Sequence, residues 1–333
     1  MPAASAELSP TLRLSDGVEM PRIGLGTAHL LCAEVLRAIQ AGARHLDCAR
    51  VYGNEAAVGE AMRLSGLQRG EFFVTTKVWC DSLRPNDVLE SCEASLADLK
   101  VDYVDCILIH WPMAWKPGTM LVADGDLAET WLAISNLVES GKARTAGVSN
   151  FDEAQLEPLL KLSRPPTVNQ IELHPHCQQS ELVSWCQRRN VVVVAWGPLA
   201  KGTALKDDRI LWATAQMHAC SLHRVSLRWN LQRDVVVIPK STSHAHVSEN
   251  LAALIGPKLS ADEMQLIRRN CDTGRKRFPD LIGIWPSTAR PAAKLFGFLL
   301  QKVLALLFKV LPAIDLPAIS RRIHEREEAR QAT

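Results

Sequence analysis

The sequence predicts an α/β fold, a (β/α)8 barrel in which eight parallel strands alternate with helices around a closed sheet. First, the apolar segments are continuous, as in Cys106–Ile109 and Val191–Ala195, which is typical of parallel strands buried on both faces. Second, eight such segments alternate with segments of helical periodicity. Third, polar residues follow many of these segments, at the strand ends where barrels form their active sites.

An open, doubly wound sheet is the alternative fold for an alternating chain of this kind. Such folds usually carry a Gly-x-Gly-x-x-Gly turn after an early strand. Here Gly24-Leu25-Gly26 is followed by Thr27-Ala28-His29, without the third glycine. The closed barrel is therefore favoured.

The predicted elements follow in order along the chain. Thr11–Leu14 and Val18–Pro21 flank Ser15-Asp16-Gly17 and predict a β-hairpin. The predicted barrel strands are 22–27, 45–47, 72–78, 105–110, 145–149, 168–172, 191–196 and 235–239. The predicted helices are 33–41, 55–64, 85–99, 127–140, 153–162, 181–189, 208–219, 223–232 and 247–254, and Asn54 is expected to cap the second of them.

Composition narrows the function class. The 333 residues suit one barrel with additions, and 47% of them are hydrophobic. The net charge of +2 gives no reason to expect a nucleic-acid partner. The nine cysteines are dispersed without a CxxC pair, which indicates reduced thiols. Because no signal-peptide run opens the chain, a cytoplasmic location is expected.

Four residues of catalytic type lie at or just after predicted strand ends. Asp47, Lys77 and His110 end three strands, and Tyr52 lies in the loop after Asp47. Each alone has an ordinary structural reading, as a turn cap, a packing residue or a satisfied core histidine. Together, at one rim of a barrel, they form a set that can carry acid–base chemistry.

The stretch Gly42–Gly59, with Thr75–Trp79 and Ile109–Pro112, resembles the aldo-keto reductases, and the resemblance extends from Thr11 to Trp285. That family folds as a TIM barrel with an N-terminal β-hairpin that plugs its bottom. Its catalytic tetrad would fall on Asp47, Tyr52, Lys77 and His110. The resemblance implies NADPH-dependent reduction of aldehydes or ketones to alcohols, by hydride transfer from the nicotinamide, with Tyr52 as the general acid.

The chemistry accounts for these residue types. The carbonyl oxygen gains negative charge and needs a positioned acid. Tyrosine has a pKa of about 10, and the ammonium of Lys77 is expected to lower it. Asp47 would hold Lys77 charged, and His110 would orient the carbonyl.

The resemblance also implies a cofactor site and a substrate pocket. The cofactor contacts would be Gly26, Thr27, Ser149, Asn150, Gln170, Trp196, Gly197, Pro198, Leu199, Lys240, Ser241, His246, Glu249 and Asn250. The carboxamide would lie at Ser149, Asn150 and Gln170, and the adenosine phosphate at Lys240 and Ser241. Trp79, Trp111 and His110 would line the pocket for a small carbonyl substrate.

The sequence departs from the family pattern at three positions. Trp196 replaces the tyrosine that stacks on the nicotinamide, and an indole can stack as well. His246 stands where an arginine often pairs with the 2′-phosphate, so NADPH is expected but NADH remains open. Ala28 replaces an aromatic residue and opens one wall of the pocket.

The two ends of the chain lie outside the resemblance. Residues 1–10 are expected to form a flexible arm, 11–285 the barrel, and 286–333 a helical extension. Within the extension, 294–311 reads as an amphipathic, largely apolar helix that Lys302 interrupts. Peripheral binding to a membrane surface and docking on the barrel or a partner both stay open.

That tail also keeps a second function class open, a non-enzymatic cofactor-binding barrel that acts as a membrane- or channel-associated regulatory subunit. The complete tetrad favours an enzyme, and a monomer is expected. No metal site is expected, because His174 and His176 lack an evident third ligand.

Overall fold

The computed structural model describes residues 8–116, 125–200, 205–255 and 258–274. The expected helix 294–311, the rest of the extension and most of the expected N-terminal arm lie outside the described residues. Among the helices in these ranges, none has the length and apolar character that crossing a membrane requires.

Eight parallel strands form the central sheet, in the order in which they occur along the chain. They are β3 (Leu25–Gly26), β4 (His45–Asp47), β5 (Phe73–Val78), β6 (Val104–Ile109), β7 (Ala143–Ser149), β8 (Val168–Glu172), β9 (Val192–Trp196) and β10 (Val236–Ile238). A parallel bridge between Ile23 and Val237 joins the first strand to the last. Gly24 N donates to Val237 O at 2.8 Å, which extends this seam. The predicted (β/α)8 barrel is confirmed.

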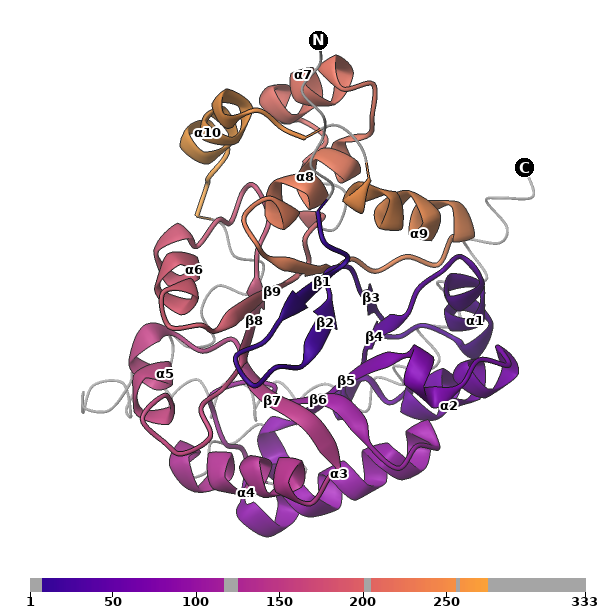
Figure 1. The fold of residues 1–333 in the computed structure, drawn as a ribbon, viewed down its shortest axis with the longest axis vertical. Helices are drawn as coiled ribbons and strands as arrows, with labels where there is room; N and C mark the ends of the chain where they lie inside the picture. Colours follow the sequence, from indigo (N-terminus) through magenta and orange to yellow (C-terminus); the bar gives the residue numbers. More distant parts are fainter. Residues whose placement is uncertain (1–7, 117–124, 201–204, 256–257, 275–333) are drawn as a thin grey trace, which may run out of the picture. The chain divides into compact units, whose positions relative to one another are not determined.

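An antiparallel hairpin covers the N-terminal end of this barrel. It consists of β1 (Thr11–Arg13) and β2 (Glu19–Pro21) and crosses the centre of the ring of strands in Figure 1. Leu14 and Met20 of the hairpin segment pack with Phe73, Leu108 and Val194 from the barrel interior. The hairpin therefore seals the apolar interior at this end, and access to the barrel is left to the opposite rim.

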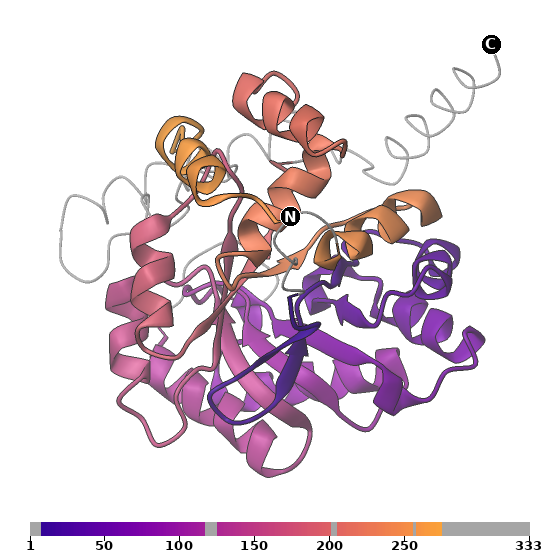
Figure 2. The ribbon, with the colours of Figure 1, turned by 45° about the horizontal axis from the view of Figure 1, so that its top comes forward.

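Helices surround the strands, as Figures 1 and 2 show. They are α1 (Cys32–Gln40), α2 (Glu55–Leu64), α3 (Pro85–Leu99), α4 (Leu127–Glu139), α5 (Glu153–Leu159), α6 (Ser180–Gln187), α7 (Arg209–Met217), α8 (Leu222–Leu231), α9 (His244–Leu251) and α10 (Ala261–Asn270). Short 3-10 turns are η1 (Arg50–Tyr52), η2 (Arg69–Glu71), η3 (Cys80–Ser82) and η5 (Ala252–Leu254).

Helix α10 was not predicted, although its start carries a sequence signal. Ser260 and Glu263 form a capping box, in which each side chain bonds the backbone N–H of the other residue. The expected cap of α2 is confirmed in its position but not in its side-chain hydrogen bond. Asn54 occupies the N-cap position of α2, but its Nδ2 donates to the carbonyls of Thr27 and Leu30 at 2.7 and 2.9 Å.

Candidate active site

The ammonium of Lys77 is the centre of the polar cluster at the C-terminal rim. It lies 2.5 Å from Asp47 Oδ1 and 2.8 Å from the carbonyl oxygen of Cys48, both at the end of β4. Tyr52 Oη lies 3.5 Å away on the η1 turn. Strands β4 and β5 pair with Asp47 beside Thr75, so Lys77 reaches back across the strand end. The structure therefore brings three of the four predicted residues into direct contact.

Burial and charge act in opposite directions on these groups. Burial alone would lower the pKa of Lys77, but Asp47 and Tyr52 outweigh it and leave that pKa raised. Burial raises the pKa of Tyr52, and the opposing effect of Lys77 does not cancel it. The expectation of a lowered tyrosine pKa is therefore not met, because it considered the ammonium and left out desolvation. Tyr52 keeps its proton throughout the neutral range.

His110 completes the cluster at the end of β6. Its ring lies edge-on to Tyr52, with 5.8 Å between the ring centroids. Burial, followed by the charge of Lys77, lowers the pKa of His110 well below its usual value. The imidazole is therefore neutral and carries a single N–H. Within the described part of the chain, its buried Nδ1 has no hydrogen-bond partner.

A chain of hydrogen bonds connects this cluster to Trp196. Gln170 Nε2 donates to Asp47 Oδ2 at 2.7 Å, and Ser149 Oγ donates to the Gln170 carbonyl at 2.8 Å. Asn150 Nδ2 donates to Ser149 Oγ at 3.0 Å, and its Oδ1 accepts from Trp196 Nε1 at 2.9 Å. The three predicted carboxamide residues and the predicted stacking residue thus form one connected unit with Asp47.

The sequence analysis missed the buried carboxylate of Glu55, which bonds residues next to Lys77 and on the turn that carries Tyr52. Glu55, only 1% exposed, accepts from Thr76 Oγ1 at 2.5 Å and from Ser95 Oγ at 3.0 Å. Arg50, at the start of the η1 turn that carries Tyr52, reaches Glu55 at 3.4 Å and also pairs with Asp98. The sequence did carry one signal for this role, because Glu55 is an acidic residue on the apolar face of the predicted helix 55–64.

Aromatic side chains extend from His110 along one side of the rim. The rings of Trp79 and His110 lie 4.9 Å apart, and those of Trp79 and Trp115 lie 5.4 Å apart at 90°. Trp79 and Trp111 are both half-buried, which leaves part of each indole accessible. On the other side, the ring of His29 lies 6.4 Å from that of Tyr52.

The predicted adenosine residues gather at the seam of the barrel. Gly26 lies under the backbone of β10, where an added Cβ would meet the Ile238 carbonyl oxygen at 3.1 Å and Lys240 Cβ at 3.8 Å. Lys240 and His246 are exposed, whereas Asn250 on α9 is buried. Lys240 precedes the first residue of α9 by four positions, and an exposed lysine shortly before a helix N-terminus suits a phosphate.

The remaining predicted cofactor residues lie at the same rim. Thr27 is fully buried and donates from Oγ1 to the Asp47 carbonyl at 2.9 Å. Gly197 has a positive φ of 60°, with open space where a Cβ would point. The Pro198 carbonyl accepts from Ser226 Oγ at 2.6 Å, which ties this loop to α8. Leu199, Ser241 and Glu249 are half-buried.

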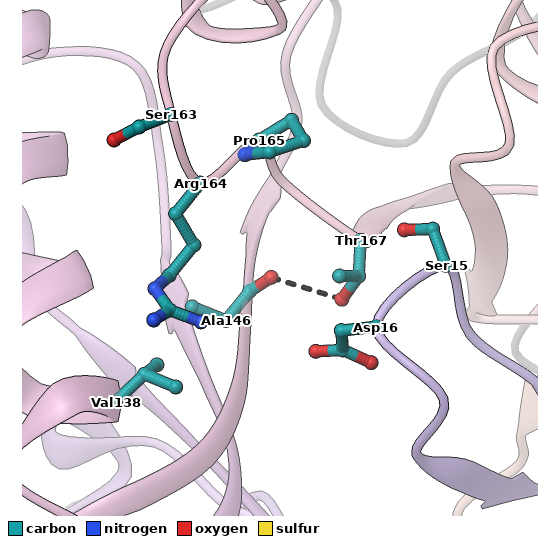
Figure 3. A pocket seen from close by; sticks show the side chains of 8 residues that line it. All are labelled: Ser15, Asp16, Val138, Ala146, Ser163, Arg164, Pro165 and Thr167. Carbon is teal, nitrogen blue, oxygen red and sulfur yellow. Dashed lines mark hydrogen bonds between the residues drawn. The ribbon is translucent and has the colours of Figure 1, made fainter.

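A separate small cavity lies at the other end of the barrel, beside the hairpin. It measures about 200 Å³, and Figure 3 shows Asp16 and Arg164 on opposite sides of it. Thr167 Oγ1 donates to the Ala146 carbonyl at 3.0 Å along its wall. None of the predicted site residues lines this cavity, so it is no part of the candidate active site.

Comparison with known proteins agrees with this architecture. The model of the aldo/keto reductase family matches residues 27–270. Aldo-keto reductase family 1 member A1-A of Danio rerio is 38% identical over 317 residues, which cover 85% of this chain and 98% of the relative. Glyoxal reductase of Bacillus subtilis is 39% identical over 266 residues, which cover 78% and 92%.

A solved structure supports the same assignment. The aldose reductase of Schistosoma japonicum superposes with a TM-score of 0.77 at 32% identity, over 82% of this chain and 95% of that one. Sequence and fold therefore agree over nearly the whole length of these relatives. The chain belongs to the aldo-keto reductase family and is an NAD(P)H-dependent oxidoreductase.

Proposed function

We propose that this enzyme reduces aldehydes and ketones to alcohols with NADPH, and that Tyr52 is the general acid. The observation that carries this proposal is the position of the Lys77 ammonium, between Asp47 Oδ1 at 2.5 Å and Tyr52 Oη at 3.5 Å. A buried lysine fixed by a carboxylate beside a phenol is an arrangement that stabilises the phenolate. The cluster also lies at the rim of the barrel where active sites form.

Each residue has a distinct part in this mechanism. Tyr52 enters with its proton held by burial and gives it to the carbonyl oxygen as negative charge develops there. Lys77 stabilises the phenolate that results, and Asp47 keeps Lys77 in place. The neutral imidazole of His110 has one N–H that can donate to the same oxygen and orient it.

The residues at the seam and the rim fit a nicotinamide dinucleotide. When bound, the nicotinamide supplies the hydride. Ser149, Asn150 and Gln170 are already fixed by mutual hydrogen bonds, and the amide of Gln170 keeps its Oε1 for an incoming carboxamide. Trp196, held by Asn150, would stack on the ring. Lys240, Ser241, His246, Glu249 and Asn250 would hold the adenosine end, and Gly26 allows close approach of a phosphate.

Among these carbonyl compounds, we expect an aldehyde with a modest apolar body to be a good substrate. Trp79 and Trp111 offer half-buried indole surface beside His110. Two relatives carry names that refer to aldehydes, the glyoxal reductase and the aldose reductase. An aromatic aldehyde is a suitable first probe, because its ring can pack against the indoles while its carbonyl reaches Tyr52.

The test follows NADPH absorbance with an aromatic aldehyde for the wild type and for Tyr52→Phe. The phenylalanine keeps the ring and removes only the acidic proton, so turnover should fall by about two orders of magnitude or more while cofactor binding persists. Tyr103→Phe, which changes the chain's other tyrosine, is the matched control and should leave turnover unchanged. If Tyr52→Phe keeps wild-type turnover, Tyr52 is not the acid, and if both proteins bind NADPH but neither turns over the aldehyde, the proposed aldehyde reduction is wrong.

A further inference from the structure

A second, larger cavity lies on the outer face of the barrel, away from the tetrad. It measures about 520 Å³ and lies between α6, α8 and α10, which Figures 1 and 2 show on one side of the ring. Its volume falls in the range of small-molecule sites, about 300–1,000 Å³. None of the residues assigned to the tetrad or to the cofactor lines it, so it needs an explanation of its own.

Two arginines give this cavity its charge. Arg233, just after α8, and Arg268 on α10 both line it, and no acidic residue does so among the described residues. The guanidinium of Arg233 stacks on Trp229, 4.1 Å from the ring centroid, and its Nη2 donates to the Gln178 carbonyl at 3.4 Å. In this part of the chain, its buried Nη1 finds no acceptor. A buried cation with an unused donor favours an anion nearby.

The electrostatic environment agrees with this interpretation. Burial, followed by repulsion from Arg268, lowers the pKa of Arg233 to about 10, and Asp272 only partly offsets them. Glu153 and Glu181 line an adjoining cavity that shares Ser180, Ser184 and Arg268 with this one. An anion is therefore favoured on the side of Arg233, away from these two carboxylates.

The rest of the wall suits an organic body. Val183, Trp229, Ala261 and Met264 contribute apolar surface, and the Ser180 and Ser184 hydroxyls lie on the α6 side. We infer that this cavity binds a small organic anion, whose carboxylate or phosphate pairs with Arg233 and Arg268 while its apolar part packs on Trp229 and Met264. This site is separate from the catalytic rim, and binding of an anion there does not depend on the reductase reaction.

Binding of phenyl phosphate and of benzoate, each in the presence of saturating NADP+, tests this inference by calorimetry and by the shift in Tm. NADP+ blocks the phosphate site at Lys240, and benzamide, which has the shape of benzoate but no charge and no alcohol to oxidise, serves as the uncharged probe. Arg268 is exposed, so Arg268→Gln should fold normally and bind the anions about tenfold more weakly. The matched control is Arg269→Gln, which removes the same charge from the neighbouring exposed position outside the cavity and should leave binding unchanged.

The two anions distinguish a phosphate ligand from a carboxylate ligand by their relative affinities. Benzamide should give no shift in Tm that depends on Arg268, because the anion supplies the main interaction. The inference is overturned if neither anion binds with NADP+ present, or if Arg268→Gln and Arg269→Gln bind equally well. Reductase activity of both variants should equal that of the wild type, which separates this site from the proposed function.

Discussion

Gln170 and Asp47 lie 123 residues apart in the sequence, and Gln170 Nε2 donates to Asp47 Oδ2 at 2.7 Å. This bond crosses the barrel from β8 to β4, two strands that are not neighbours in the sheet. It gives the second oxygen of Asp47 a partner, while the first oxygen holds Lys77. The proposed carboxamide site and the proposed acid site are therefore parts of one buried hydrogen-bonded network.

Replacing Gln170 by leucine should lower turnover more than it lowers stability. Asp47 Oδ2 would lose its donor, and kcat should fall about tenfold, the effect of one charge-assisted hydrogen bond. Gln178→Leu is the matched control, because Gln178 is equally buried and donates to the carbonyls of Pro175 and Ile267 away from the site. If steady-state kinetics show equal kcat values for the two variants, the bond to Asp47 has no part in catalysis.

The buried pair of Lys77 and Asp47 predicts strong coupling between two substitutions. Lys77→Met leaves a buried carboxylate without its cation and should lower the free energy of unfolding by about 3–5 kcal/mol. The double variant Asp47→Asn with Lys77→Met removes both charges and should recover much of that loss. Urea unfolding of both single variants and the double variant measures the coupling energy, and additive losses would contradict the prediction.

Burial of two histidines predicts a specific dependence of stability on pH. Burial lowers the pKa of both His45 and His110 in the folded protein, and Lys77 adds to the effect at His110. The unfolded chain therefore binds more protons below about pH 6.5, so the free energy of unfolding falls as the pH drops from there. Each histidine contributes at most about 1.4 kcal/mol per pH unit to this slope.

Urea unfolding between about pH 5 and pH 7.5 measures that slope. His110→Asn removes one titrating group, and its slope should be shallower than that of the wild type. An unchanged slope would show that His110 titrates normally in the folded protein. In the same variant, aldehyde reduction should be impaired across the whole range, because the proposed donor to the carbonyl is gone.

The raised pKa of Tyr52 predicts the alkaline limb of activity. Reduction needs the protonated phenol, and burial keeps that form present beyond the usual tyrosine pKa of about 10. The pH profile of kcat/KM for the reduction should therefore be free of a tyrosine titration between roughly pH 7 and pH 9. A fall in kcat/KM within that window, in a protein that circular dichroism shows to be folded there, would contradict the assigned direction.

The parallel order of the strands made one feature of the candidate site predictable from the sequence, namely the rim at which its residues lie, and the family resemblance suggested their roles. All strands of such a barrel end at one rim, so Asp47, Lys77 and His110 were expected on the same rim once the strands were recognised. The contact from Gln170 to Asp47 depends on barrel diameter and on side-chain direction, which strand patterns do not contain. The pKa direction of Tyr52 depends on how deeply the phenol is buried, which also follows only from the packed structure.

Local sequence signals for helix caps predict a hydrogen bond correctly only when the side chain has no better partner elsewhere in the fold. Asn54 is a good N-cap by residue type, yet its amide donates to the carbonyls of Thr27 and Leu30 in the loop between β3 and α1, because those carbonyls come within reach in the folded barrel. The capping box of Ser260 and Glu263 is a local signal for α10 that the sequence analysis did not use. Glu55 was missed because a buried carboxylate is uncommon, and its partners Thr76 and Ser95 lie far along the chain.

Cofactor preference can be tested at the one departure from the family pattern near the proposed phosphate site. His246 is exposed on α9, and arginine there would present a planar, permanently charged fork to a 2′-phosphate. His246→Arg should raise the ratio of kcat/KM for NADPH over NADH by about tenfold. His244→Arg adds the same charge to the same helix at another exposed position, and an equal change in that variant would assign the effect to general electrostatics.

Glu55 supplies the last prediction, because it joins the turn that carries Tyr52 to the strand that carries Lys77. Its carboxylate accepts from Thr76, the neighbour of Lys77, and pairs with Arg50 of η1. Glu55→Leu removes these acceptors and leaves the two hydroxyls of Thr76 and Ser95 buried without partners. The free energy of unfolding should fall by about 2–4 kcal/mol.

Turnover of the folded Glu55→Leu variant should also fall, with kcat affected more than KM, since Tyr52 and Lys77 would lose their common support. Glu60→Gln is the control, because Glu60 lies one and a half turns further along α2 and pairs at the surface with Arg63 and Lys100. That variant should unfold at nearly the wild-type urea midpoint and keep its kcat. Wild-type kcat in Glu55→Leu would mean that this carboxylate supports only the packing of α2 and α3, and that η1 is held in place by other contacts.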